Sequence, residues 1–205
     1  MDMPEYLRVD EREDAINALE HAVETALTLE DNPLNWKWVI VAIHNALQGA
    51  LVCTVSGTDG SGALSDKSRK EMWEWFEASR TDPDAPYPVE WLAAPLKLYE
   101  RAKDPAYMQE FGGEPLRTTQ EEDDDVKRLN NLRIGFAHFV PKGWSIESVG
   151  LPRIVLNATA IIEILMLSHP ACTFRLEPEQ IASVQKAIAM LRELLPTDAT
   201  ATKSG

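Results

Sequence analysis

The chain has 205 residues and a mass of 22.9 kDa, with 44% hydrophobic and 26% charged residues, an ordinary globular composition. A chain of this length can bury a core without disulfides or metals, which excludes a fully disordered or fibrous protein and predicts one domain. The net charge of −13 and the isoelectric point of about 4.7 argue against unspecific nucleic-acid binding, although a local basic site stays open.

The first predicted helix covers Asp14 to Leu29, where apolar residues recur at helical spacing, and it ends before Asn32-Pro33. The next helix runs from about Asn35 to Thr54 and is apolar on nearly all sides, so it should be central. The stretch from Trp36 to Val55 has the length of a membrane span. Polar residues at its centre favour the buried helix of a soluble protein.

Loops and helices alternate through the middle of the chain. Asp66 is expected to cap one of these helices, because acidic side chains accept hydrogen bonds at helix starts. The predicted segments are a Gly/Ser loop over 56–65, a helix from Asp66 through Trp73, Trp75 and Phe76, a proline-rich linker over 79–88, and helices over 89–102 and 105–111.

Three longer helices are predicted in the second half. Thr118 or Thr119, followed by acidic residues, is typical of a helix start, and that helix should run to about Phe139. The later helices are expected over 152–168, which is very apolar, and over 177–195. Residues 196–205 are polar and are expected to be a disordered tail.

These elements predict an all-α fold, an antiparallel helical bundle forming a single domain over residues 1–195, because alternating strand patterns are nearly absent. The N-terminus lacks the apolar stretch of a signal peptide. Cys53 and Cys172 lie 119 residues apart and form no metal-binding motif. We therefore expect two reduced, buried cysteines in a cytoplasmic protein without cofactors, metals or a membrane partner.

Positive charge gathers in one segment of this acidic chain. Residues 126–153 contain Lys127, Arg128, Arg133, Lys142 and Arg153 against the single acid Glu147. A solvated helix surface is one interpretation, and an electropositive site for an anion is the other.

Within this segment, LNNLRIGFAHFVPKGW over residues 129–144 holds Arg133 and His138 five positions apart, near a helix end. On an ideal helix they would point about 140° apart, but Gly135 between them and Pro141 after them favour a relaxed backbone. Arginine holds a phosphate with a planar fork and histidine titrates near neutral pH, so the pair suits phosphate chemistry.

The spacing of these two residues, near a helix end in a small all-α chain, resembles the Arg-x4-6-His signature of the HEPN superfamily. The surrounding string, together with LPRIVLNATAIIEIL and WKWVIVAIHNALQGALVC, resembles a bacterial family of HEPN-like proteins over about residues 35–168. The resemblance implies a helical bundle that forms a homodimer. It also implies a composite cleft in which Arg133 and His138 of both protomers cut RNA without a metal ion.

The implied reaction is attack of a 2′-hydroxyl on the adjacent phosphate, with His138 as acid and base and Arg133 stabilising the charge. The chain departs from the HEPN pattern at Ile134, where active members usually carry a polar residue, often Asn. Asn130 and Asn131 are candidates to supply that polarity. The alternative is a non-catalytic module that binds a protein, a nucleotide or RNA.

Other residues have a structural and a functional interpretation. His44 is either a satisfied core group or part of a polar cluster with Arg133 and His138. Glu163, in an apolar helix, should have an arginine or His44 as partner. Lys142 and Trp144 form a turn or a lid that stacks a base. The other five tryptophans are expected in the core or at a subunit interface, whereas His21 and His169 show no pattern.

Overall fold

The computed structural model describes residue 6 and residues 9–111, 113–137 and 145–195. Helices dominate these residues, which contain no strand and a single isolated β-bridge between Leu64 and Leu92. This arrangement confirms the all-α prediction. The elements are α1 Glu11–Ala26, η1 Pro33–Asn35, α2 Trp36–Val55, η2 Ser61–Ala63, α3 Asp66–Ser79, α4 Pro95–Lys103, α5 Pro105–Phe111, α6 Gln120–Ala137, α7 Leu151–Glu163, η3 Ile164–Ser168, α8 Pro170–Thr173 and α9 Pro178–Leu194.

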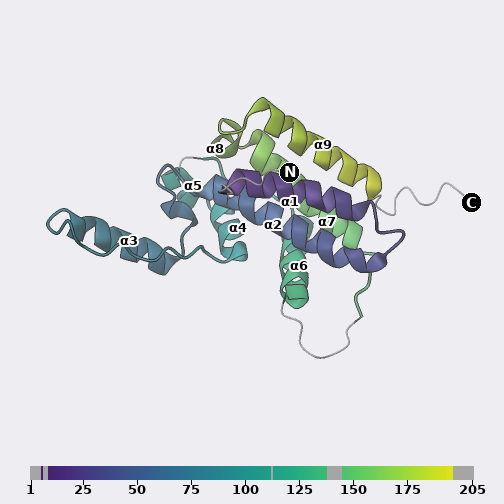
Figure 1. Cartoon of the computed structure of the whole chain (residues 1–205), viewed down its shortest axis with the longest axis horizontal. Helices are drawn as coiled ribbons and strands as arrows, with labels where there is room; N and C mark the ends of the chain where they lie inside the picture. The colour runs from purple at the N-terminus through teal and green to yellow at the C-terminus, as the bar shows by residue number, and fades with distance from the viewer. Residues whose placement is uncertain (1–5, 7–8, 112, 138–144, 196–205) are drawn as a thin grey trace, which may run out of the picture.

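Helix α2 is the centre of the bundle and contacts α1, α4, α6, α7 and α8 (Figure 1). It packs closely against α1 because small residues face each other there. A Cβ atom at Gly49 would lie 2.8 Å from the Glu11 carbonyl oxygen and 2.9 Å from the Ala15 Cβ atom. α2 and the helix from α7 through η3 provide seven of the twelve largest fully buried side chains, as their apolar sequences predict.

Two helices, Pro33–Val55 and Leu151–Ser168, are long and apolar enough to cross a membrane by length and composition. The sequence indicated only the first. In their most apolar windows, 72% and 50% of the residues are buried inside the protein, as in the core helices of soluble proteins. Length and composition are therefore weak evidence for a membrane span.

Side-chain caps fix several helix starts. Thr119, rather than Thr118, precedes α6, and it exchanges hydrogen bonds with Glu122, whose Oε2 atom accepts from the Thr119 N–H at 2.7 Å. The prediction that Asp66 caps α3 is wrong. Ser65 is the cap, since its hydroxyl oxygen accepts from the Ser68 N–H at 3.2 Å, and Asp66 is the first helical residue.

The predicted helix over 89–102 begins only at Pro95. Ala94 is extended, as expected for a residue before proline. The preceding stretch pairs with the start of the α3 region instead, since the Trp91 carbonyl accepts from the Ser65 N–H at 2.7 Å and the Ala93 N–H donates to the Ala63 carbonyl at 2.9 Å.

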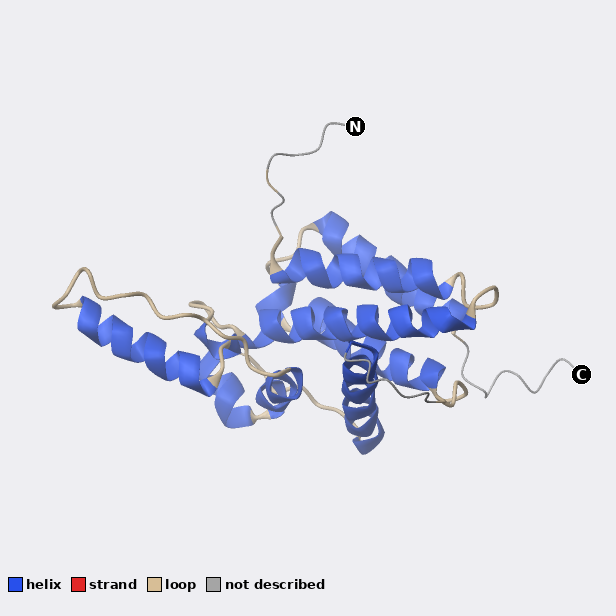
Figure 2. Ribbon diagram, turned by 60° about the horizontal axis from the view of Figure 1, so that its bottom comes forward, coloured by secondary structure: helices blue, strands red, loops and turns tan. Residues whose placement is uncertain are grey.

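α3 and the loop that follows it project from the bundle as an arm, residues 61–94 (Figures 1 and 2). Only Ser68 of α3 is buried. The arm is tied to the bundle by the buried Arg101 of α4, which donates to the Gly62 and Leu64 carbonyls at 3.1 and 2.6 Å and pairs with Asp66 at 2.6 Å.

Candidate functional site

The last turns of α6 carry three of the predicted site residues. Asn130 is buried against the bundle, Asn131 is exposed, and Arg133 is partly buried. Asn130 and Arg133 are three positions apart, so they lie on neighbouring faces of the helix. The two asparagines therefore lie on different sides of α6. Asn130 faces the bundle, near Arg133, and Asn131 faces solvent.

Asn130 meets His44 of α2 across the helix pair, with the His44 Nε2 atom 3.2 Å from the Asn130 Oδ1 atom. With the amide oxygen in this place, the Nε2 atom carries the hydrogen and donates. Burial lowers the pKa of His44 below its usual range, the bond to Asn130 raises it in part, and the positive charge of Arg133 lowers it further. His44 is therefore a neutral core group hydrogen-bonded to Asn130.

Arg133 differs from most arginines of this protein. No carboxylate pairs with its guanidinium within the part of the chain that the structure describes, although Arg12, Arg69, Arg101, Arg175 and Arg192 all have such partners. A partly buried guanidinium without a carboxylate can bind an anion without first breaking an ion pair.

The basic segment is less positive than its sequence indicates. Arg153 pairs with Glu121 at 2.6 Å and with Asp125 at 3.1 Å, and Lys127 lies 3.5 Å from Asp124. These acids lie in the first two turns of α6. Asp124 is three residues before Lys127 on the same helix, whereas Glu121 and Asp125 pair with Arg153 of the next helix, α7. Of the described cations of the segment, Arg128 and Arg133 form no ion pair with a described carboxylate and stay available to an anion.

His138, Lys142 and Trp144 lie outside the described residues. Ile134, which follows Arg133, is 45% exposed. Its side chain thus stands on the surface beside Arg133, where the HEPN pattern has a polar group.

The remaining predicted residues have structural partners. Glu163 pairs with Arg192 of α9, as expected for an acid in an apolar helix, with a 3.3 Å bond between Arg192 Nη1 and Glu163 Oε1. His169, which the sequence left without a role, is buried and bonds the Glu114 carbonyl oxygen through its Nε2 atom at 2.9 Å. His21 is exposed and lies 3.7 Å from Glu24.

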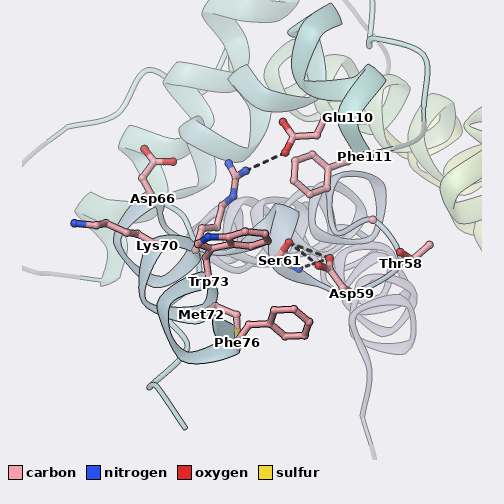
Figure 3. A pocket seen from close by; sticks show the side chains of 12 residues that line it. Thr58, Asp59, Ser61, Asp66, Lys70, Met72, Trp73, Phe76, Glu110 and Phe111 are labelled. Atoms are coloured by element: carbon pink, nitrogen blue, oxygen red, sulfur yellow. Dashed lines mark hydrogen bonds and ion pairs between the residues drawn. The ribbon is translucent and has the colours of Figure 1, made fainter. Parts of the chain in front are cut away.

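Sequence reasoning missed a notch of about 850 Å³ between the arm and the bundle (Figure 3). Trp73 and Phe76 of α3 form one wall, and Asp59, Glu110 and Phe111 stand opposite them. Trp73 is 64% and Phe76 48% exposed, so of the two places predicted for the tryptophans, the core or a subunit interface, the core is excluded for Trp73. Trp38 and Trp91 are also exposed.

Among the described residues, no group of three or more His, Cys, Asp or Glu side chains is placed to hold a metal ion. No protein-family model matches the chain, and neither the curated proteins nor the solved structures give a match. The HEPN resemblance thus stays a prediction from sequence.

Proposed function

We propose that the end of α6 binds a phosphate group of RNA and that this chain is a HEPN-like endoribonuclease of the cytoplasm that needs no metal ion. The observation that carries the proposal is Arg133, a partly buried guanidinium with no carboxylate partner among the described residues of a chain with net charge −13. Its neighbours Asn130 and His44 are neutral and hydrogen-bonded to each other, so they leave its charge intact.

In the proposed reaction His138 accepts the proton of an RNA 2′-hydroxyl while that oxygen attacks the adjacent phosphorus atom. The bond to the 5′-oxygen breaks, and the leaving oxygen takes up a proton. Arg133 donates two parallel hydrogen bonds to the phosphate oxygens, on which negative charge develops. The products end in a 2′,3′-cyclic phosphate and a 5′-hydroxyl.

The test is incubation of purified protein with RNAs of varied sequence in the presence of EDTA. We expect cleavage by the wild type, a loss of roughly 10²–10⁴ in rate for His138→Ala, and a marked loss for Arg133→Lys, which keeps the charge but not the fork. Arg128→Lys, on the exposed surface of the same helix, is the matched control and should cleave normally. Wild-type cleavage no faster than that of His138→Ala would refute the catalytic proposal.

A second candidate is a binding module without catalysis, favoured by the exposed Ile134 beside Arg133. In that case the wild type binds single-stranded RNA, Arg133→Ala weakens the binding, and no product forms. Toxicity on expression separates the two candidates cheaply, since only the nuclease should slow growth, and His138→Ala should abolish the effect.

A further inference from the structure

Two thiols lie next to each other in the core, away from the proposed site at the end of α6. Cys53 of α2 and Cys172 of α8 are the two cysteines of the chain and are 3% and 0% exposed. Both are free, and no metal-binding group of His, Cys, Asp or Glu lies among the described residues. The chemistry open to this pair is therefore a reaction between its own sulfur atoms.

The packing of α8 on α2 places the Cys172 sulfur over the helix turn that carries Cys53. The Cys172 Sγ atom lies 3.4 Å from the Thr54 Oγ1 atom and donates to the Ala50 carbonyl oxygen at 3.8 Å. Cys53 and Thr54 follow Ala50 by three and four positions, so both lie on the side of α2 that Ala50 marks. A hydrogen bond also joins the two thiols.

The turn that carries Cys172 is fixed on both sides. The Thr173 hydroxyl donates to the His169 carbonyl oxygen at 2.8 Å, which closes the short helix. Just after this helix, the Arg175 guanidinium donates to the Gly57 carbonyl oxygen at 3.1 Å, beyond the end of α2. The fold therefore keeps the two sulfurs together although their residues are 119 positions apart.

We propose that Cys53 and Cys172 form a reversible disulfide that joins α2 to α8, with a small disulfide such as oxidised glutathione as the oxidant. In the first step one cysteine, as its thiolate, attacks the small disulfide, which gives a mixed disulfide and releases one small thiol. In the second step the other cysteine attacks the protein sulfur of the mixed disulfide and releases the second small thiol. The protons of both cysteines end on the released thiols. Two protein thiols are thus oxidised and one small disulfide is reduced.

Burial makes this exchange slow and its product durable. Both sulfurs are covered in the closed fold, so the small disulfide reaches them when the core opens. As the core closes, the second thiol meets the mixed disulfide at a high effective concentration, because the step is then intramolecular. The closed fold afterwards shields the new bond from reductants. The proposal does not depend on the nuclease function, because neither cysteine belongs to α6.

The experiment is incubation of the full chain with oxidised glutathione, in enough urea to let the core open, followed by removal of the urea and mass spectrometry. We expect the wild type to lose the mass of two hydrogen atoms, to carry no bound glutathione and to give one peptide pair joined through Cys53 and Cys172. The oxidised chain should unfold at higher urea concentration than the reduced chain. Its equilibrium constant of unfolding should be roughly 100-fold lower or less, because the bond closes a loop of more than half the chain.

A thiol moved by one position along α8 is the matched control. In Cys172→Ala combined with Thr173→Cys, the thiol points about 100° away around the helix axis, so it should pair poorly with Cys53 and keep bound glutathione. Circular dichroism checks that this variant has the helix content of the wild type. A wild type that stays reduced or ends with bound glutathione, a control that pairs with Cys53 equally well, or a disulfide that leaves the unfolding curve unchanged would overturn the proposal.

Discussion

His44 is an imidazole enclosed by the contact of α2 with α6, 3% exposed and hydrogen-bonded to Asn130. Burial lowers its pKa, so the folded protein holds it neutral at a pH at which the unfolded chain, with a pKa of about 6.5, is already partly protonated. Between these two pKa values the unfolded chain binds more protons than the folded protein. The contribution of His44 to stability is thus complete above about pH 6.5 and falls as the pH falls below it.

We predict that the free energy of unfolding of the wild type decreases from pH 7 to pH 5 more steeply than that of His44→Gln. The glutamine keeps a donor for Asn130 but cannot be protonated. The difference in slope should be at most about 1.4 kcal/mol per pH unit, the value for one proton. Urea denaturation at several pH values measures it, with His21→Gln as the exposed control. Parallel curves for wild type and His44→Gln would show that His44 is not held neutral by the fold.

The sequence alone could not tell which cations of the basic segment pair with carboxylates and which do not. Arg133 and Arg153 look equivalent there, yet Arg153 pairs with Glu121 and Asp125, which lie about thirty residues earlier and meet it only because α6 packs on α7. The local pattern did indicate Arg133 as the residue to examine. Its lack of a carboxylate partner among the described residues depends on tertiary contacts that no local spacing reveals.

At the scale of elements, one buried arginine ties the base of the arm to the bundle. Arg101 is 3% exposed and holds the segment that enters the arm, since it donates to the Gly62 and Leu64 carbonyls and pairs with Asp66. The guanidinium also lies 5.1 Å from the centre of the Tyr107 ring. Removing the arginine would leave the Leu64 carbonyl at the arm's base without its donor, whereas the Gly62 carbonyl would keep the Tyr107 hydroxyl at 2.8 Å.

Arg101→Met should therefore destabilise the protein by about 2–4 kcal/mol, because buried acceptors that lose a charged donor are costly. The loss should appear first in α3, whose amide protons should exchange faster than those of α2 in hydrogen-exchange experiments. Arg117→Met, at an exposed arginine, is the control and should change little. If α2 and α3 lost protection equally in Arg101→Met, the arm would not be an independently opening element.

Local patterns predicted most helices because caps, prolines and apolar spacing act within a few residues. The helix over 66–79 was expected, but its position away from the bundle was not, since exposed and buried aromatic faces have the same spacing in sequence. For the same reason Trp73 was assigned to a core or an interface without a choice between them. The stretch before Pro95 was misjudged because its hydrogen-bond partners, residues 63–65, are distant in sequence.

At the scale of the whole molecule, one core joins the two halves of the chain. Cys53 of α2 and Cys172 of α8 are 3% and 0% exposed, and the Cys172 thiol lies 3.4 Å from the Thr54 hydroxyl. Both cysteines are free and buried, as their spacing and context predicted. A hydrogen bond with the Cys172 thiol, together with burial, raises the pKa of the Cys53 thiol, which keeps it in the unreactive protonated form.

Because both thiols belong to this single core, we predict that iodoacetamide labels them only when the whole domain opens. In native buffer both should react roughly 10³-fold or more slowly than a free cysteine, given the usual stability of a domain. With added urea the two labelling rates should rise together and follow the loss of helix signal, and mass spectrometry of peptides around each cysteine measures them separately. Replacing Cys53 by Ala should leave this dependence for Cys172 in place. Fast labelling of Cys172 while Cys53 stays protected would mean that α8 opens by itself and does not belong to the single cooperative core.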